Sequence, residues 1–107
     1  MITTQKQLVL TKYETIIILK SDLSEDNITE LIDKYQEVLA KNHTKNIFIQ
    51  NRGRRHLIYP IKQYHDGIFI QINYEANGIL VNLFAKLLKF DENVLRFMTI
   101  KNMLEKL

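Results

Sequence analysis

The sequence predicts an α+β domain in which two helices cover one face of a four-stranded antiparallel sheet, in the order βαββαβ. Two segments predict the helices, because their apolar residues recur at steps of three and four. Four segments rich in β-branched and aromatic residues predict the strands. This order defines the ferredoxin-like sandwich. With 107 residues, the chain has the usual size of one domain.

The first strand and the first helix are predicted from two adjacent patterns. Residues 13–20 are apolar and β-branched, which is typical of a central strand covered on at least one face. Ser24 is a suitable N-cap, and Glu25 and Asp26 fall in the first turn, where they complement the helix dipole. The apolar stripe that should pack on the sheet consists of Ile28, Leu31, Ile32, Tyr35, Val38 and Leu39.

The second and third strands are predicted to form an antiparallel hairpin. The two halves of the second strand cover residues 46–49 and 57–62. Gly53 between them indicates a bulge or kink, and Pro60 indicates a locally exposed edge, because proline cannot donate to a ladder. Asp66-Gly67 is a strong reversal signal between two apolar segments, so we predict the turn there and the third strand over residues 68–74.

A second helix and a fourth strand complete the predicted domain. Asn77 can cap a helix with apolar residues at helical spacing: Ile79, Leu80, Leu83, Phe84, Leu87 and Leu88. Residues 94–101 predict the fourth strand. We therefore expect an N-terminal arm over residues 1–12, the domain over residues 13–101 and a C-terminal tail over residues 102–107.

The charges are segregated along the chain although the net charge is only +3. Residues 22–37 carry six carboxylates and one cation, whereas residues 38–65 carry no carboxylate and hold six lysines and arginines and all three histidines. A phosphate backbone attracts such a basic segment, because each neutralised phosphate releases a condensed counterion. A solvated basic loop that binds nothing explains the same pattern, so both interpretations stay open at this point.

Residues that would carry catalysis or hold a cofactor are sparse. The chain has no cysteine, which excludes disulfides, thiolate metal sites and cysteine nucleophiles. The histidines match no local metal-ligand spacing, and the three glycines form neither a P-loop nor a dinucleotide fingerprint. No apolar segment has the length that a bilayer requires. We therefore expect no catalytic residue, metal, cofactor, small-molecule substrate or membrane partner.

RNA-recognition modules with this topology stack bases on alternate aromatic residues of the third strand. In this chain Gly67 is followed by Ile68, Phe69 and Ile70, which predicts aliphatic residues at the stacking positions. We therefore expect no stacking platform. Contacts with RNA should instead come from cations on loops and strand edges, which read the backbone and shape of the RNA.

A series of short motifs resembles a known family. The motifs are Tyr13-Glu14, Gly53-Arg54-Arg55 followed by Leu57, Tyr59-Pro60-Ile61, Asp66-Gly67 and Asn93-Val94-Leu95-Arg96. In this order they resemble the sixth small-subunit ribosomal protein of bacteria and plastids, over about residues 13–101. The resemblance implies a ribosomal protein that binds the central domain of small-subunit rRNA together with the eighteenth small-subunit protein. It implies a ribosome in the plastid stroma or the bacterial cytoplasm, and neither catalysis nor a cofactor.

The resemblance also implies which residues contact rRNA or the partner protein. Arg54, Arg55 and Arg96 occupy matched motif positions and are the principal candidates. The full expected set is Arg52, Arg54, Arg55, His56, Tyr59, Lys62 and Arg96. A salt bridge across the sheet is the alternative role for Arg96, and packing within the domain is the alternative role for Tyr59.

Two other classes of protein use the ferredoxin-like fold. One is a regulatory domain that binds a small metabolite, and the other is a small dimeric enzyme. Both require polar residues that converge on one place. Because this sequence has no such cluster at its predicted strand ends, the ribosomal binding module is the favoured hypothesis.

Overall fold

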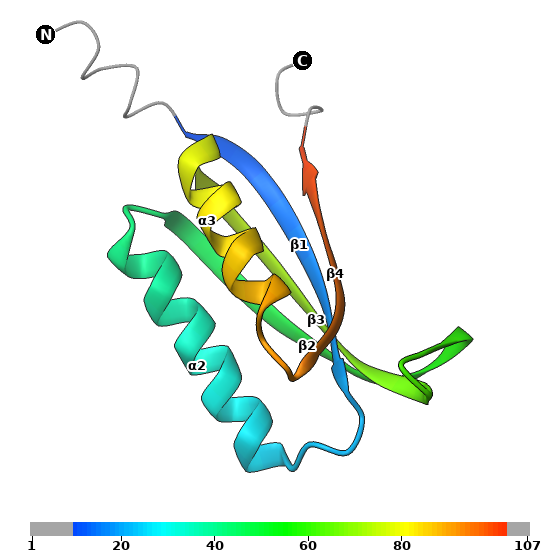
Figure 1. The fold of residues 1–107 in the computed structure, drawn as a ribbon. Coiled ribbons are helices and arrows are strands. Elements are labelled where there is room, and N and C mark those ends of the chain that lie inside the picture. The colour runs from blue at the N-terminus through cyan, green and yellow to red at the C-terminus, as the bar shows by residue number, and fades with distance from the viewer. Residues whose placement is uncertain (1–9, 103–107) are drawn as a thin grey trace, which may run out of the picture.

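The computed structural model describes residues 10–102 and shows a four-stranded antiparallel sheet with both helices on one face (Figure 1). The elements are β1 (Thr11–Lys20), α2 (Glu25–Lys41), β2 (Lys45–Ile61), β3 (Tyr64–Ala76), α3 (Gly78–Lys89) and β4 (Val94–Lys101). The strand order is β2-β3-β1-β4, so β2 and β4 are the edges of the sheet. The predicted ferredoxin-like βαββαβ fold is confirmed.

The first strand is longer than predicted. It begins at Thr11, and Lys12 pairs with Glu75 of β3. The backbone N–H of Asn102 donates to the carbonyl of Lys12 at 2.8 Å, so the two ends of the described chain meet at one end of the sheet. The remainder of the predicted N-terminal arm, residues 1–9, and of the predicted tail, residues 103–107, lies outside the described residues.

Both predicted helix caps are confirmed. The Ser24 Oγ accepts the backbone N–H of Asn27 at 3.2 Å at the start of α2. The Asn77 Oδ1 accepts the backbone N–H of Leu80 at 2.8 Å at the start of α3. Each cap satisfies a donor that the first helical turn leaves without an intrahelical partner, which fixes where the helix begins.

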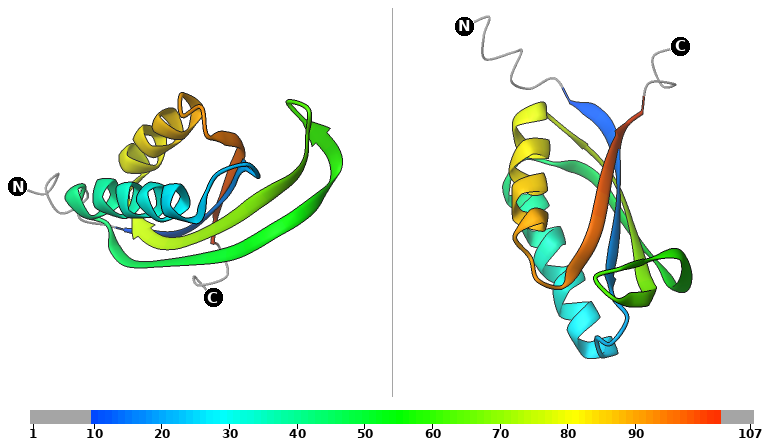
Figure 2. Two further views of the ribbon diagram at one scale, coloured as in Figure 1. Left: turned by 90° about the horizontal axis from the view of Figure 1, so that it is seen from below. Right: turned by 45° about the vertical axis from the view of Figure 1, so that its right-hand side comes forward.

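The core lies between the helices and the sheet (Figure 2). Its largest fully buried side chains are Tyr35, Phe84, Ile17, Leu19, Leu39, Ile70, Ile72, Leu88 and Thr15. The α2 stripe packs as predicted, but Ile79 and Leu83 of α3 are 77% and 49% exposed. Since α3 packs mainly through Leu80, Phe84 and Leu88, Ile79 and Leu83 face outward, whereas Leu87 of the predicted stripe still packs against the core.

The predicted interruption at Gly53 is a β-bulge in β2. Asn51 pairs with Ile70 and Gly53 with Phe69, so β2 has one extra residue, Arg52, between two consecutive pairs. Gly53 has a φ of 86°, which strongly favours glycine, and its N–H donates to the Asn51 Oδ1 at 2.8 Å. The bulge therefore changes the direction in which the Arg52 side chain leaves the strand.

The predicted turn at Asp66-Gly67 is wrong, because the chain reverses at Lys62 and Gln63. These two residues have φ values of 49° and 71°, and Ile61 pairs with Tyr64 on either side of them. Positive φ at both central residues is typical of the type I′ turn, whose twist matches that of the flanking strands. Lysine and glutamine rarely mark such a turn, so the strand pairing overrides the local sequence signal.

Gly67 has a packing role within β3 instead. It pairs with Lys20 of β1 and Arg55 of β2, in the middle of the sheet. A Cβ atom at this position would overlap the Ile18 Cγ2. The glycine is therefore required for close approach between neighbouring strands and not for a turn.

Candidate nucleic-acid interface

No other element of residues 10–102 covers the face of the sheet that points away from the helices, and we call it the open face. Successive side chains of a strand alternate between the two faces, and Ile17 and Ile70 are buried against the helices. Their neighbours therefore lie on the open face. One row across the sheet contains Gly53, Phe69, Ile18 and Arg96, and the next open-face row contains Gln50, Gln71, Ile16 and Met98.

Two of the expected site residues, Arg52 and Arg55, meet on the open face. The Arg52 Nε donates to the Gln71 Oε1 at 2.9 Å, across the β2–β3 pair. The guanidinium carbon of Arg55 lies 5.8 Å from the centre of the Phe69 ring, within the range of a cation–π contact. Both side chains are thus held over β3 by contacts that leave guanidinium N–H groups for a ligand, because arginine has five such donors.

Arg96 belongs to the same surface. Ile18 of β1 pairs with Phe69 of β3 on one side and with Arg96 of β4 on the other. The Arg96 side chain is exposed. Among residues 10–102 it forms no ion pair, so the alternative of a salt bridge across the sheet is not supported. An exposed guanidinium next to apolar side chains can bind an anion through charge-assisted hydrogen bonds.

Arg54 does not lie with the other arginines. It pairs with Ile68, a core residue, and its own side chain is exposed. Because strand residues alternate, Arg54 and Arg55 point to opposite faces. The two consecutive arginines of the motif therefore serve two different surfaces.

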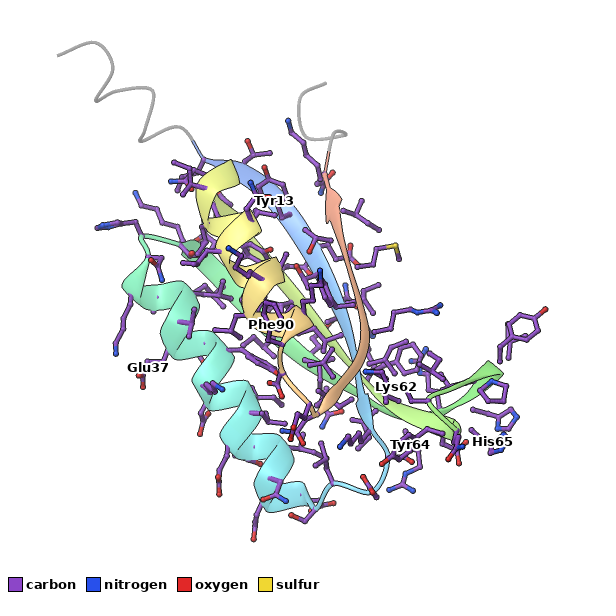
Figure 3. All side chains as sticks on the ribbon, viewed as in Figure 1. Tyr13, Glu37, Lys62, Tyr64, His65 and Phe90 are labelled. Atoms are coloured by element: carbon purple, nitrogen blue, oxygen red, sulfur yellow. The ribbon has the colours of Figure 1, made fainter. Side chains whose placement is uncertain are left out.

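The remaining expected residues lie on the protruding end of the β2–β3 hairpin. We call residues 56–66 the hairpin arm. His65 lies on its outer side in Figure 3, whereas the Tyr64 hydroxyl donates to the Asp22 Oδ2 at 3.0 Å. Between the pairs His56–Asp66 and Ile61–Tyr64, β2 advances five residues and β3 advances two, so the β2 side bulges outward. The His56 Nδ1 and the Asp66 Oδ1 are 3.1 Å apart at the base of the arm.

The outward bulge exposes three apolar residues. Ile58 is 86% exposed and Tyr59 is 76% exposed, and Pro60 next to them is also exposed. Packing within the domain, the alternative role for Tyr59, is therefore excluded. Exposed aromatic and aliphatic residues in one contiguous segment are typical of a protein-binding surface.

The acidic residues of α2 occupy the other side of the molecule. The exposed carboxylates of α2 include Glu30, Asp33 and Glu37, and Figure 3 shows Glu37 pointing away from the sheet. Lys41 neutralises one of them through an ion pair with Glu37 at 3.0 Å. The charge segregation seen in the sequence thus becomes a separation between an acidic helix and an arginine-bearing open face.

The prediction that aliphatic residues occupy the stacking positions is wrong. Ile68 and Ile70 are buried under the helices, whereas Phe69 lies on the open face and is partly exposed. Sequence reasoning missed Phe69 and its neighbour Gln71. The signal was present, because the alternation of Ile68, Ile70 and Ile72 assigns those three to the core and Phe69 to the opposite face.

The described part of the chain offers no catalytic or metal-binding arrangement. Within residues 10–102, no three His, Asp or Glu side chains group closely enough to hold a metal ion. Neither α2 nor α3 is both long and apolar enough to cross a membrane. The surface instead presents cations, an aromatic ring and aliphatic side chains.

This fold and surface are those of a binding module of the α+β sandwich class. The family model for ribosomal protein S6 matches residues 12–101, and the chain belongs to that family. Members of this family are structural components of the ribosome and not enzymes. The alternatives of a metabolite-binding domain and a dimeric enzyme are therefore without support.

Individual relatives agree with the family assignment. The chain is 51% identical over 98 residues to the small ribosomal subunit protein bS6c of Pyropia yezoensis, covering 92% of this chain and 90% of that protein. It is 39% identical over 89 residues to the protein bS6 of a Picosynechococcus strain, covering 83% and 77%. The crystal structure of 30S ribosomal protein S6 from Thermotoga maritima superposes with a TM-score of 0.85, covering 92% of this chain and 94% of that chain; at 19% identity it supports the fold alone.

Proposed function

We propose that this chain is a structural component of a plastid or bacterial small ribosomal subunit, where it binds the central domain of small-subunit rRNA together with the eighteenth small-subunit protein. Relatives from red algae carry the name bS6c and cyanobacterial relatives carry the name bS6, both as small ribosomal subunit proteins. The observation that carries the RNA part of the proposal is the gathering of Arg52, Arg55 and Arg96 on the open face.

Phosphate groups of rRNA are the natural ligands of these three arginines. Guanidinium groups bind phosphate through paired N–H donors, and the contact gains free energy from counterion release. Glu14, the carboxylate of β1 on the open face, pairs with Asn73 and Ile100, two rows away from Phe69. The acidic residues of α2 are separated from this surface by the sheet itself. The geometry therefore favours one orientation of the protein on RNA, with the helices facing away.

The partner protein has a different surface available to it. Ile58, Tyr59 and Pro60 are exposed on the hairpin arm, and β2 is an edge strand whose outer side pairs with no other strand of the described residues. Such an edge can accept a strand or an apolar segment of another protein. We expect the C-terminal tail to be a second partner surface, and its residues 103–107 lie outside the described residues.

Binding of the two partners should be coupled. A chain with a net charge of only +3 gains little long-range attraction to RNA, so tight binding needs a second contact. If the partner protein holds this chain against the same RNA, the second binding event becomes effectively intramolecular. We therefore expect weak RNA binding by the free chain and tight binding by the pair.

Co-sedimentation tests this function. The tagged chain, incubated with small ribosomal subunits that lack it, should sediment with them in sucrose gradients. A triple variant with Arg52→Ala, Arg55→Ala and Arg96→Ala should dissociate at a lower salt concentration, because it loses phosphate contacts. Lys34→Ala, which removes one exposed cation from α2, is the control and should sediment like the parent. A chain that stays at the top of the gradient even at low salt would disprove ribosomal assembly.

A further inference from the structure

The open face contains a hollow of about 280 Å³ between β2 and β3. Its lining residues are Ile16, Arg52, Arg55, Phe69, Ile70 and Gln71. The apolar floor comes from β1 and β3, and the arginines come from β2 on one side. Pockets for drug-sized ligands have volumes of roughly 300–1,000 Å³. This hollow therefore has room for one planar ring system and not for a larger metabolite.

Three local features build the hollow. The bulge around Gly53 supplies Arg52 as an extra residue of β2, and its hydrogen bond to Gln71 holds it at the rim. Arg55 pairs with Gly67, whose lack of a side chain lets Ile18 pack closely there, and the Arg55 guanidinium extends over Phe69. The backbone geometry of β2 and β3 thus determines which side chains line the hollow.

We propose that this hollow receives one unpaired nucleotide of the RNA, with its base against the Phe69 ring and the Arg55 guanidinium and its phosphate near Arg52 and Arg96. The proposal rests on the proposed function, because it states how RNA occupies the open face. Protein sites for unpaired RNA stack bases on aromatic rings and on arginine planes. Phe69 and Arg55 supply one group of each kind at a separation of 5.8 Å.

Charge favours a nucleotide over a neutral or basic peptide of the partner, and the small apolar area argues against an acidic peptide as well. The described lining of the hollow carries two guanidinium groups and an amide but no carboxylate, and Arg96 adds a third cation in the row of Phe69. The apolar atoms below these cations are too few for the buried core of a protein interface, which involves about 20–30 residues a side. A single base with its phosphate matches both the small apolar floor and the cationic rim.

The amide of Gln71 adds a polar group at the edge of the base. Its Oε1 accepts from Arg52 at 2.9 Å, and its Nε2 donates to the Asn73 Oδ1 at 3.3 Å. An unstacked base exposes hydrogen-bonding edges that stacked, paired bases conceal. The Arg52–Gln71 pair can contact such an edge while the ring lies on Phe69, so the site should prefer unpaired over double-stranded RNA.

Two substitutions test the stacking contact directly. Phe69→Leu keeps an apolar side chain but removes the aromatic face. The matched control is Phe48→Leu, at another exposed phenylalanine on β2, whose side chain is 58% exposed. Affinity for central-domain rRNA is measured in the presence of the partner protein. Because base–aromatic stacking contributes ~1–3 kcal/mol per base, Phe69→Leu should lose at least about fivefold in affinity and Phe48→Leu should lose little. Thermal unfolding of each variant establishes that it is folded.

A second variant separates stacking from charge. Arg55→Lys retains the cation but loses the planar guanidinium, so affinity should fall while the salt dependence of binding stays that of the parent. Photo-cross-linking with RNA that contains 5-iodouridine, followed by mass spectrometry, should also give an adduct on the peptide that contains Phe69. Thermal unfolding again confirms folding.

The outcomes distinguish the two levels of the proposal. If the parent binds the rRNA and Phe69→Leu binds as tightly as Phe48→Leu, without a cross-link near Phe69, the nucleotide site is overturned and ribosomal assembly stands. If Phe69→Leu instead weakens binding to the partner protein in the absence of RNA, the open face is a protein interface and the nucleotide site is again overturned. If the parent does not bind the rRNA even with the partner, the proposed function itself fails.

Discussion

The guanidinium of Arg55 lies over the ring of Phe69, 5.8 Å from its centre, on the face of the sheet that the helices leave uncovered. The residue before it in the chain, Arg54, points to the other face, opposite the core residue Ile68. A pair of adjacent arginines that looks like one basic motif in the sequence therefore divides between two surfaces. Only Arg55 shares the open face with Arg52 and Arg96.

The first prediction follows from this division. Arg55→Ala should weaken binding to central-domain rRNA, measured with the partner present, and should reduce the slope of log K against log salt by up to about 0.9 per lost phosphate contact. Arg54→Ala should change the slope less, and the double variant should resemble Arg55→Ala. Lys34→Ala on α2 serves as the charge control. Equal slopes for parent and double variant would show that both arginines are merely solvated.

The second prediction concerns Gly67. Its Cβ would overlap the Ile18 Cγ2, and a β-branched side chain in a central strand can avoid it only by leaving its preferred rotamer. Gly67→Ala should therefore reduce the free energy of unfolding by about 1–3 kcal/mol in urea titrations. The cost should shrink in an Ile18→Ala background. The control is Gly78→Ala, where the new Cβ meets nothing within 4 Å, and this variant should be neutral or slightly stabilising. Similar losses of unfolding free energy at both glycines would contradict the packing role of Gly67.

The third prediction concerns stability at alkaline pH. The pKa of Tyr35 is raised, first by burial and then by its hydrogen bond to the Asp91 Oδ2, which is 2.9 Å long. The folded chain therefore keeps this proton at a pH where the unfolded chain, with a tyrosine pKa of about 10, loses it. Since the unfolded state then binds fewer protons, the free energy of unfolding should fall as pH rises above about 10.

Tyr35→Phe tests this mechanism. The variant loses the hydrogen bond to Asp91 and should be less stable near neutral pH by roughly 1 kcal/mol. Above about pH 10 its stability should decline less steeply than that of the parent, because phenylalanine has no proton to lose. Burial also raises the pKa of Tyr74. This tyrosine should therefore cause part of the alkaline loss of stability in both the parent and the variant. Parallel pH profiles would rule out Tyr35 as a source of the alkaline sensitivity.

The fourth prediction concerns the hairpin arm. Tyr59→Ala should weaken the affinity for the eighteenth small-subunit protein, measured by calorimetry, by about tenfold, because exposed tyrosines in interfaces often contribute more than 1 kcal/mol. The stability of the free chain should not change, since this side chain is 76% exposed. Phe90→Ala, at a 74% exposed residue just after α3, is the matched control. Equal losses at both positions would assign no special role to the arm.

The fold could be predicted because each element has a local signal. Ser24 and Asn77 mark the helix starts, and Gly53 marks the bulge through its positive φ. The turn could not be predicted, because Lys62 and Gln63 carry no turn signal and the register of the flanking strands decides their conformation. Asp66-Gly67 resembles a turn signal, but its glycine is needed for close packing between strands, which the local sequence does not reveal.

The candidate site was only partly predictable. The arginines stand out as a basic segment, but which of them share a face depends on a one-residue bulge that shifts the alternation in β2. Arg96 joins Arg52 and Arg55 only through the strand order β2-β3-β1-β4, a long-range property of the sheet. The exposure of Tyr59 likewise depends on the extra residues on the β2 side of the hairpin arm.

The most direct test of the proposed function is an equilibrium titration of this chain with central-domain rRNA, with and without the eighteenth small-subunit protein. The free chain should bind weakly, and the partner should increase its affinity at least about tenfold, or ~1.4 kcal/mol of coupling. The partner's affinity for the RNA should increase by the same factor when this chain is present, because coupling is reciprocal. Equal affinities with and without the partner would contradict the account and would mean that this chain binds RNA independently.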